Sequence, residues 1–120
     1  MDWLHDTISK FGQNMGLDAL ALDEHGFLQL NFEQWGQFCL ELIGTDLLVY
    51  LSRPIPQYDD KAPRRALQLC HYSEGWTWLP NVALTDDEHL LFAMRLQATD
   101  VSLPNLEKAL EQLNMLHDRL

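Results

Sequence analysis

Three apolar-rich runs within residues 27–52, separated by short turns, constrain the fold of this chain most. In the first run, FLQLNF, the apolar residues Leu28, Leu30 and Phe32 share one face, while Gln29 and Asn31 lie on the other. This pattern is typical of a strand with one buried side. The runs QFCLELI and LLVYLS follow after short turns that contain glycine. Together they predict an antiparallel meander of three strands, entered through the turn DEHG at residues 23–26.

Helical spacing predicts a helix at each end of the chain. Four apolar residues near the start share one helical stripe: Leu4, Ile8, Phe11 and Met15. Gly16 follows them, so the first helix is expected over residues 2–15. Near the end, Ser102 is a plausible N-cap and Pro104 suits a first turn. A leucine stripe then predicts the last helix: Leu103, Leu106, Leu110, Leu113 and Leu120.

The middle of the chain adds a short helix and two strands. Pro63 and the acidic residues before it predict a helix over residues 62–73. An irregular strand broken by Pro80 follows, and then a clearer strand at 88–97. The expected order is α-β-β-β-α-β-β-α, an α+β fold in which helices pack on a twisted, mainly antiparallel sheet. With 120 residues, the chain is expected to form one domain, 1–120.

Charge and cysteine content narrow the function classes. The net charge of −10 disfavours nucleic acid and anionic lipid as partners, and its plainest role is solubility. The two cysteines form no CxxC pair, which argues against a disulfide scaffold and a cysteine zinc site. No run suits a signal peptide or a membrane span. We therefore expect a cytoplasmic protein.

No motif in the sequence indicates catalysis. The five histidines show no H-x-x-x-H or H-E-x-x-H spacing, and no phosphate-binding glycine loop or G-x-S-x-G occurs. The acidic run Asp86, Asp87 and Glu88 beside His89 is more typical of a solvated turn than of a metal site. His117 falls on the apolar stripe of the last helix, as a core or interface histidine does. We expect no enzyme, no metal and no cofactor.

Apolar residues exceed what so small a core needs. Trp35, Trp76 and Trp78 fall in or beside predicted loops, and Leu48 and Tyr50 lie on the second face of a predicted strand. Together they indicate that a sheet face or edge is covered by another protein, part of which could be a second copy.

The element order and the turn LDEHGFLQLNF resemble the small acidic class I chaperones of bacterial type III secretion, and most of all the SycN family. The likeness spans nearly the whole chain by element order and is residue-specific at the two ends. The opening MDWLHDTISKFGQNMG is similar at five positions: Trp3, Ile8, Ser9, Phe11 and Gly16. The ending is similar at seven: Leu103, Pro104, Ala109, Glu111, Gln112, Leu113 and Leu116.

The resemblance implies a function and partners. A SycN-like protein would be a dimer-forming secretion chaperone, cytoplasmic or peripheral at the secretion apparatus. It would bind the N-terminal segment of a secreted gatekeeper, YopN-like, and keep it competent for secretion. Its second subunit would be a YscB-like chaperone. Strand addition at a sheet edge and apolar grooves would suffice for such binding, with no catalytic group.

Six residues are expected to make these contacts. For the dimer interface we expect three residues of the second helix and the following strand: Leu67, Trp76 and Trp78. For the client we expect three apolar residues left off the predicted core faces: Trp3, Leu48 and Tyr50. Three alternatives stay open: a homodimeric class I effector chaperone, a regulatory protein that sequesters a secretion regulator, and a small enzyme using the acidic turn.

Overall fold

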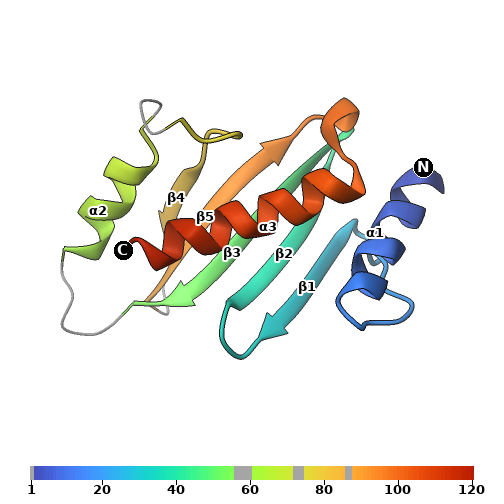
Figure 1. The fold of residues 1–120 in the computed structure, drawn as a ribbon, viewed down its shortest axis with the longest axis horizontal. Coiled ribbons are helices and arrows are strands. Elements are labelled where there is room, and N and C mark those ends of the chain that lie inside the picture. Colours follow the sequence, from blue (N-terminus) through green and yellow to red (C-terminus); the bar gives the residue numbers. More distant parts are fainter. Residues whose placement is uncertain (1, 56–60, 72–74, 86–87) are drawn as a thin grey trace.

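The expected strand meander forms one side of a five-stranded antiparallel sheet. The computed structural model describes residues 2–55, 61–71, 75–85 and 88–120. The strands within this part are β1 (Phe27–Phe32), β2 (Gly36–Ile43), β3 (Asp46–Pro54), β4 (Asn81–Leu84) and β5 (His89–Leu96). They lie in the order β1-β2-β3-β5-β4, so that β1 and β4 form the two edges (Figure 1).

The turn before β1 is built by one carboxylate and one glycine. Asp23 Oδ1 accepts hydrogen bonds from the backbone N–H groups of His25 and Phe27, each at 2.9 Å. Gly26 has a φ of 76°, which suits glycine, and its carbonyl accepts from the N–H of Leu42 at 2.8 Å. The turn therefore sets the register in which β1 meets β2, with Phe27 opposite Glu41.

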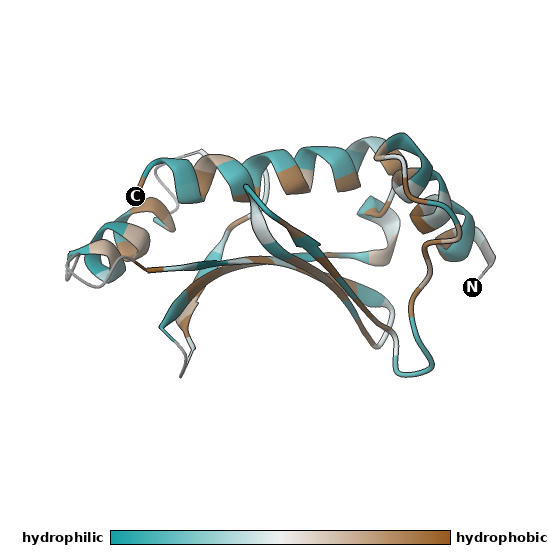
Figure 2. Ribbon diagram, turned by 90° about the horizontal axis from the view of Figure 1, so that it is seen from below, coloured by the Kyte–Doolittle hydropathy of each residue, from teal (hydrophilic) through white to brown (hydrophobic). Residues whose placement is uncertain are grey.

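The helices lie on one side of the sheet, one across its middle and the others toward its two ends (Figure 2). They are α1 (Asp2–Asn14), α2 (Ala62–Leu69) and α3 (Leu103–Asp118). α3 lies across β3 and β5 and contacts α1, whereas α2 lies beside β4. Ser102 caps α3 as expected, because its Oγ accepts from the N–H of Asn105 at 3.2 Å.

Three details differ from expectation. The irregular strand expected around Pro80 is shorter, since β4 comprises only Asn81–Leu84 and Trp76 and Trp78 lie before it; Pro80 cannot donate to a strand ladder. α2 ends at Leu69 rather than at residue 73, since Cys70 is the C-cap and the N–H of His71 bonds the Gln68 carbonyl in a tightened last turn. Residues 72–73 of the expected helix lie outside the described residues. A short 3-10 helix, Ala98–Asp100, joins β5 to α3 and has no clear sequence signal.

The core lies between the sheet and the helices. Alternate residues of the three central strands point into it: Phe38, Leu40, Leu47, Val49, Leu51, Leu90, Phe92, Met94 and Leu96. The helices contribute their apolar stripes, chiefly Leu4, Ile8, Phe11, Leu106, Leu113 and Leu116. Each side chain of this size contributes about 1.5–3 kcal/mol when fully buried. The strand alternation and the helical stripes place these side chains in one core, and this burial stabilises the α+β fold.

Candidate functional site

The face of the sheet opposite the helices is open (Figure 2). We call its apolar centre the open face; it consists of Cys39, Leu48, Tyr50, Leu91 and Ala93. The strand register brings these residues together, since Tyr50 lies between Cys39 of β2 and Ala93 of β5. Leu48, Tyr50, Leu91 and Ala93 are half-buried by one another and by their neighbours. An antiparallel sheet with one solvated face usually carries polar residues there, so this apolar centre is unusual.

The ionisable groups of the open face are uncharged at neutral pH. Burial raises the pKa of the Cys39 thiol, with a smaller opposing effect from its hydrogen bond to Tyr50. Burial also raises the pKa of Tyr50, to about 12. At the rim of the face, Arg95 Nε donates to Asp46 Oδ2 at 2.8 Å, which joins β5 to β3. The open face therefore suits contact with apolar groups, and its thiol is a poor nucleophile.

The outer edge of β1 has unused main-chain groups. Gly26 and Leu42 form a hydrogen-bonded pair, so Leu28 and Leu30 also bond to β2, and the intervening residues point their N–H and C=O groups outward. Asp23 satisfies both outward groups of Phe27. For Gln29 and Asn31, no main-chain partner at this edge occurs within the described part of the chain. We call these four groups the β1 edge. They form a template for another strand.

A small pocket lies at the start of the β1 edge. It has a volume of 210 Å³, and leucines from three segments line its apolar wall: Leu4, Leu22 and Leu42. His5, Asp23 and Glu24 line its polar side. A pocket of this size and composition suits one apolar side chain with a polar or charged neighbour.

A second apolar surface lies at the opposite end of the molecule. Leu67 of α2, Leu79 in the segment before β4 and Leu84 of β4 are 65%, 60% and 58% exposed, the largest values among the large apolar side chains that the structure describes. We call them the α2–β4 patch. Because α2 lies beside β4, three such leucines at one end favour a protein contact (Figure 1).

Trp76 and Trp78 support this end of the molecule from within. The indole N–H of Trp76 donates to the carbonyl of Leu69 at 2.6 Å, and the Arg119 guanidinium lies 5.0 Å from its ring centre. The amide of Gln112 in α3 donates to the Trp78 carbonyl at 2.8 Å. Both tryptophans are half-buried against the core, so they hold the segment before β4 onto α3.

The C-terminal turns of α3 are fastened to β3 by Arg53 and His117. Arg53 donates to the Trp35 carbonyl at 2.6 Å, to Asn114 Oδ1 at 2.8 Å and to Asp118 Oδ1 at 2.9 Å. His117 Nε2 lies 2.8 Å from the Leu51 carbonyl oxygen. Burial lowers the pKa of His117 to about 4, so its imidazole is neutral and donates this bond. The expected core position of His117 is confirmed.

The described residues contain neither a metal-binding cluster nor a membrane-spanning helix. Within residues 2–55, 61–71, 75–85 and 88–120, His, Cys, Asp and Glu side chains form no group of three or more that could hold a metal ion. The acidic turn lies partly outside these ranges, since Asp86 and Asp87 are not described. No helix in the described ranges is long and apolar enough to cross a membrane.

The structure separates the six residues expected to make contacts. Leu67 is exposed on α2, whereas Trp76 and Trp78 are half-buried in the segment before β4. Leu48 and Tyr50 lie side by side on the open face. Trp3 is 43% exposed on α1, in the helical layer on the other side of the sheet. A single segment that contacts Trp3 and Tyr50 would therefore pass around the β1 edge.

Sequence reasoning missed two parts of these surfaces. The alternation over residues 27–32 predicts a strand but does not reveal that β1 is an edge strand, because strand order depends on how the whole sheet assembles. Leu79 and Leu84 flank the Pro80 break in the irregular strand. In the sequence they are only two leucines in a segment without regular alternation. They do not indicate an exposed patch unless the position of α2 is known.

Solved structures share this fold. A structure of the Yersinia pestis type III secretion chaperone SycH in complex with a YscM2 fragment matches with a TM-score of 0.72 and 18% identity, over 96% of this chain and 98% of that one. The ExsC–ExsE complex matches with a TM-score of 0.73 and 19% identity, over 95% and 86%. YbjN, a putative transcription regulator from E. coli, matches with a TM-score of 0.60 and 18% identity, over 92% of this chain and 86% of that one. The fold by itself therefore does not identify a function.

The family is identified by sequence. No curated protein sequence gives a match. The model of the family described as type III secretory system chaperone SycN matches residues 3–120, nearly the whole chain. This chain therefore belongs to the SycN family of type III secretion chaperones.

Proposed function

We propose that this chaperone binds the N-terminal segment of a secreted gatekeeper protein, YopN-like, and keeps it competent for secretion. The observation that carries the proposal is the sheet with helices on one face only, which leaves an apolar open face and an unpaired β1 edge. Both features bind protein segments through burial and main-chain hydrogen bonds, and neither needs a reacting group. The protein acts in the cytoplasm, without enzymatic activity or cofactor.

The client makes its contacts along a path around the β1 edge. Trp3 lies at one end of this path, the main-chain groups of Gln29 and Asn31 lie in its middle, and Leu48 and Tyr50 lie on the open face beyond. Occupying the apolar groups of the client in this way keeps them from forming a core of their own. Solved relatives of the fold include a complex described as chaperone and effector, HopA1–SchA, which supports a protein client.

A second small chaperone, YscB-like, covers the α2–β4 patch. Leu67 makes the contact directly, and Trp76 and Trp78 hold the surface in place behind it. Leu79, which lies before β4, and Leu84, at the end of β4, extend the contact. The patch and α1 lie at opposite ends of the molecule, so the partner subunit and the client do not compete for the same surface (Figure 1).

Native mass spectrometry of the tagged protein, recovered from its own cells, tests this proposal. We expect one copy of this chain, one copy of a second small chain and a longer secreted protein. A homodimer with an effector would replace the gatekeeper assignment by an ordinary effector chaperone. Recovery with a protein that is never secreted would replace it by a regulatory role.

A further inference from the structure

The negative charge of this protein is concentrated in the half of the chain that forms the β1 edge. Residues 1–52 hold eight acidic residues against one basic residue, Lys10, which gives −7 of the total charge of −10. This half forms α1, β1, β2 and most of β3. A partner that lies along this half therefore meets a strongly negative surface.

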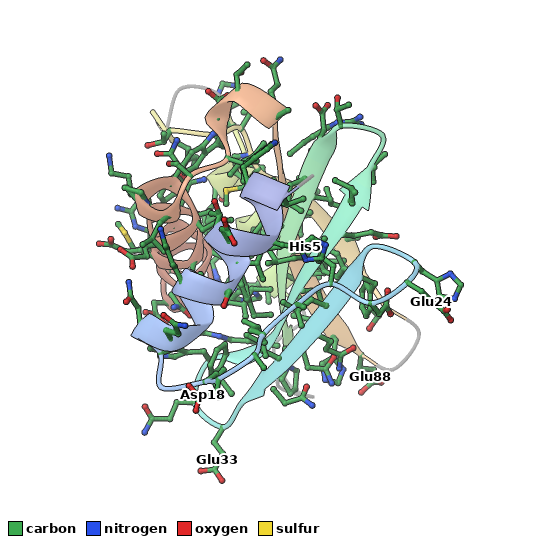
Figure 3. All side chains as sticks on the ribbon, turned by 90° about the vertical axis from the view of Figure 1, so that its right-hand side faces the viewer. His5, Asp18, Glu24, Glu33 and Glu88 are labelled. Atoms are coloured by element: carbon green, nitrogen blue, oxygen red, sulfur yellow. The ribbon has the colours of Figure 1, made fainter. Side chains whose placement is uncertain are left out.

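Carboxylates flank both ends of the β1 edge. In Figure 3, which shows the molecule from this side, Glu24 lies beyond the start of β1, while Asp18 and Glu33 lie toward its other end. All three residues are exposed. Asp23 adds a carboxylate to the pocket at the start of the strand, next to Glu24. Two histidines lie near these carboxylates: His5 lines the same pocket, and His25 Nε2 lies 3.5 Å from Glu24 Oε1.

Between these carboxylates the strand offers main-chain groups and an apolar strip. Gln29 and Asn31 direct their N–H and C=O groups outward. Leu28, Leu30 and Phe32 point to the helical side and are only half-buried. The pocket formed by Leu4, Leu22 and Leu42 continues this strip past the start of β1. An added strand would thus find hydrogen bonds in its middle and apolar contacts on alternate side chains.

Resting on the proposed chaperone function, we propose that the client segment at the β1 edge is an extended strand with alternating apolar residues and Lys or Arg at both ends. The basic residues at one end face Asp23 and Glu24, and those at the other face Asp18 and Glu33. β1 has six residues, and a strand rises roughly 3.3 Å per residue. The two basic ends are therefore separated by about five or six residues of the client.

This charge pattern also explains how the edge rejects wrong strands. A free edge strand pairs with almost any extended chain, including a second copy of itself. A second copy brings the same carboxylates, and like charges placed opposite one another disfavour the pairing. The acidic flanks therefore select a basic segment and oppose self-association through β1.

Two synthetic peptides with one apolar core test the inference. KKLSVTIKK carries lysines at both ends, and EELSVTIEE carries glutamates in their place. Each is labelled with fluorescein and titrated with the purified chain, and binding is followed by fluorescence anisotropy. We expect the lysine peptide to bind more tightly by roughly tenfold or more at low salt, because each exposed ion pair contributes a factor of about two. The advantage should shrink at about 500 mM salt, where exposed charges are screened.

A matched pair of variants locates the effect. The triple variant Asp18→Asn, Glu24→Gln, Glu33→Gln removes three exposed carboxylates beside the β1 edge. The control Asp100→Asn, Glu107→Gln, Glu111→Gln removes three exposed carboxylates in α3 and before it. Both change the net charge equally. The first should reduce the preference for the lysine peptide severalfold, since only Asp23 of the four carboxylates remains, and the second should keep the preference unchanged.

Three results would overturn the inference: equal binding of both peptides, no binding of either, or a lysine preference that the first triple variant retains undiminished. The proposed function is judged separately, by recovery of a secreted protein from cells. Capture of a secreted client together with equal peptide binding would refute only the charge inference. A lysine preference without capture of any secreted protein would refute the proposed function instead.

Discussion

At the scale of single residues, this protein depends on a few polar groups that hold the apolar layers in register. His117 is the clearest case, since it lies in the core with its ring against Phe92, 4.8 Å between ring centres, and bonds the Leu51 carbonyl. The sequence places it on an apolar stripe, and this predicts its burial. The strand carbonyl that receives its hydrogen bond depends on the packing of α3 on β3, which no local pattern specifies.

Stability should fall on mild acidification because of His117. Burial lowers its pKa from 6.5 to about 4 in the folded protein, so the unfolded chain binds this proton more readily. The contribution is complete above pH 6.5 and is lost progressively toward pH 4. Between pH 7.5 and 5 the free energy of unfolding should drop by about 2 kcal/mol from this group. Urea denaturation at both pH values measures the drop.

The variant His117→Gln serves as the control for this loss. Glutamine can still donate to the Leu51 carbonyl but does not titrate. The variant should be less stable at pH 7.5 and should lose less stability on acidification than the native chain. An unchanged acid response in the variant would assign the effect to other groups.

Two glycines with positive φ should respond differently to alanine. Gly36 has a φ of 107°, and a Cβ there would overlap the Ser52 carbonyl oxygen of β3. Gly44 has a φ of 62° with open space around it. We expect Gly36→Ala to lower the free energy of unfolding by about 3 kcal/mol or more, and Gly44→Ala by about 1 kcal/mol. Equal losses in thermal or urea denaturation would contradict the overlap at residue 36.

At the scale of elements, the sequence patterns predict which segments are helices and strands better than how these segments are joined. The apolar-rich runs at 27–32, 37–43 and 47–52 and the stripe of the last helix correspond to β1, β2, β3 and α3. In contrast, Arg53 joins β3, the β1–β2 turn and α3 through contacts 18, 61 and 65 residues apart. Such joints depend on tertiary structure, so a single sequence does not reveal them.

Removing the hydrogen bonds of Arg53 should increase local unfolding at the C-terminal end of α3. Arg53→Ala loses three hydrogen bonds from a side chain that is only 20% exposed, and should cost about 2–3 kcal/mol. Arg95→Ala is the matched control, because its pair with Asp46 is 55% exposed on the arginine side and should cost less than about 1 kcal/mol. Hydrogen exchange of α3 amides should rise only in the first variant.

A charge on α2 tests the proposed partner contact. Leu67→Glu should abolish assembly with a second chain, since it places a carboxylate in the α2–β4 patch. Leu67 is 65% exposed, so the free energy of unfolding should change by less than about 0.5 kcal/mol. Gln68→Glu adds the same charge at the next exposed position and should leave assembly intact. Light scattering after gel filtration measures the mass of the assembly that each variant forms. Normal assembly of Leu67→Glu would exclude this patch as the interface.

At the scale of the whole molecule, the candidate surfaces are more dispersed than a sequence can indicate. Leu48, Tyr50 and Trp3 are all apolar and off the predicted core faces, yet the sheet separates the first two from Trp3. Only the strand order shows that β1 lies between them as an edge. The excess of apolar residues predicts that another protein binds this one. The path that the bound segment follows can be inferred only from the arrangement of the sheet and the helices.

The open face should be needed for client capture and not for folding. Leu48→Glu puts a charge at the centre of this face, where Leu48 is half-buried, and should reduce recovery of the secreted client by about tenfold or more. Thr45→Glu, in the exposed turn before β3, adds the same charge and should have no effect. Quantitative recovery of the client with the first variant would remove the open face from the binding path.

The contact between α1 and α3 has a consequence for how this protein is made. α1 is translated well before α3, the 16-residue helix that it contacts. The hairpins β1–β2 and β2–β3 can pair before α3 has been made, whereas the helical layer is complete only once α3 has been translated and packed. Until then the apolar stripe of α1, which includes Leu4, Ile8 and Phe11, lacks its contact with α3, and a partly folded chain of this kind is prone to aggregation.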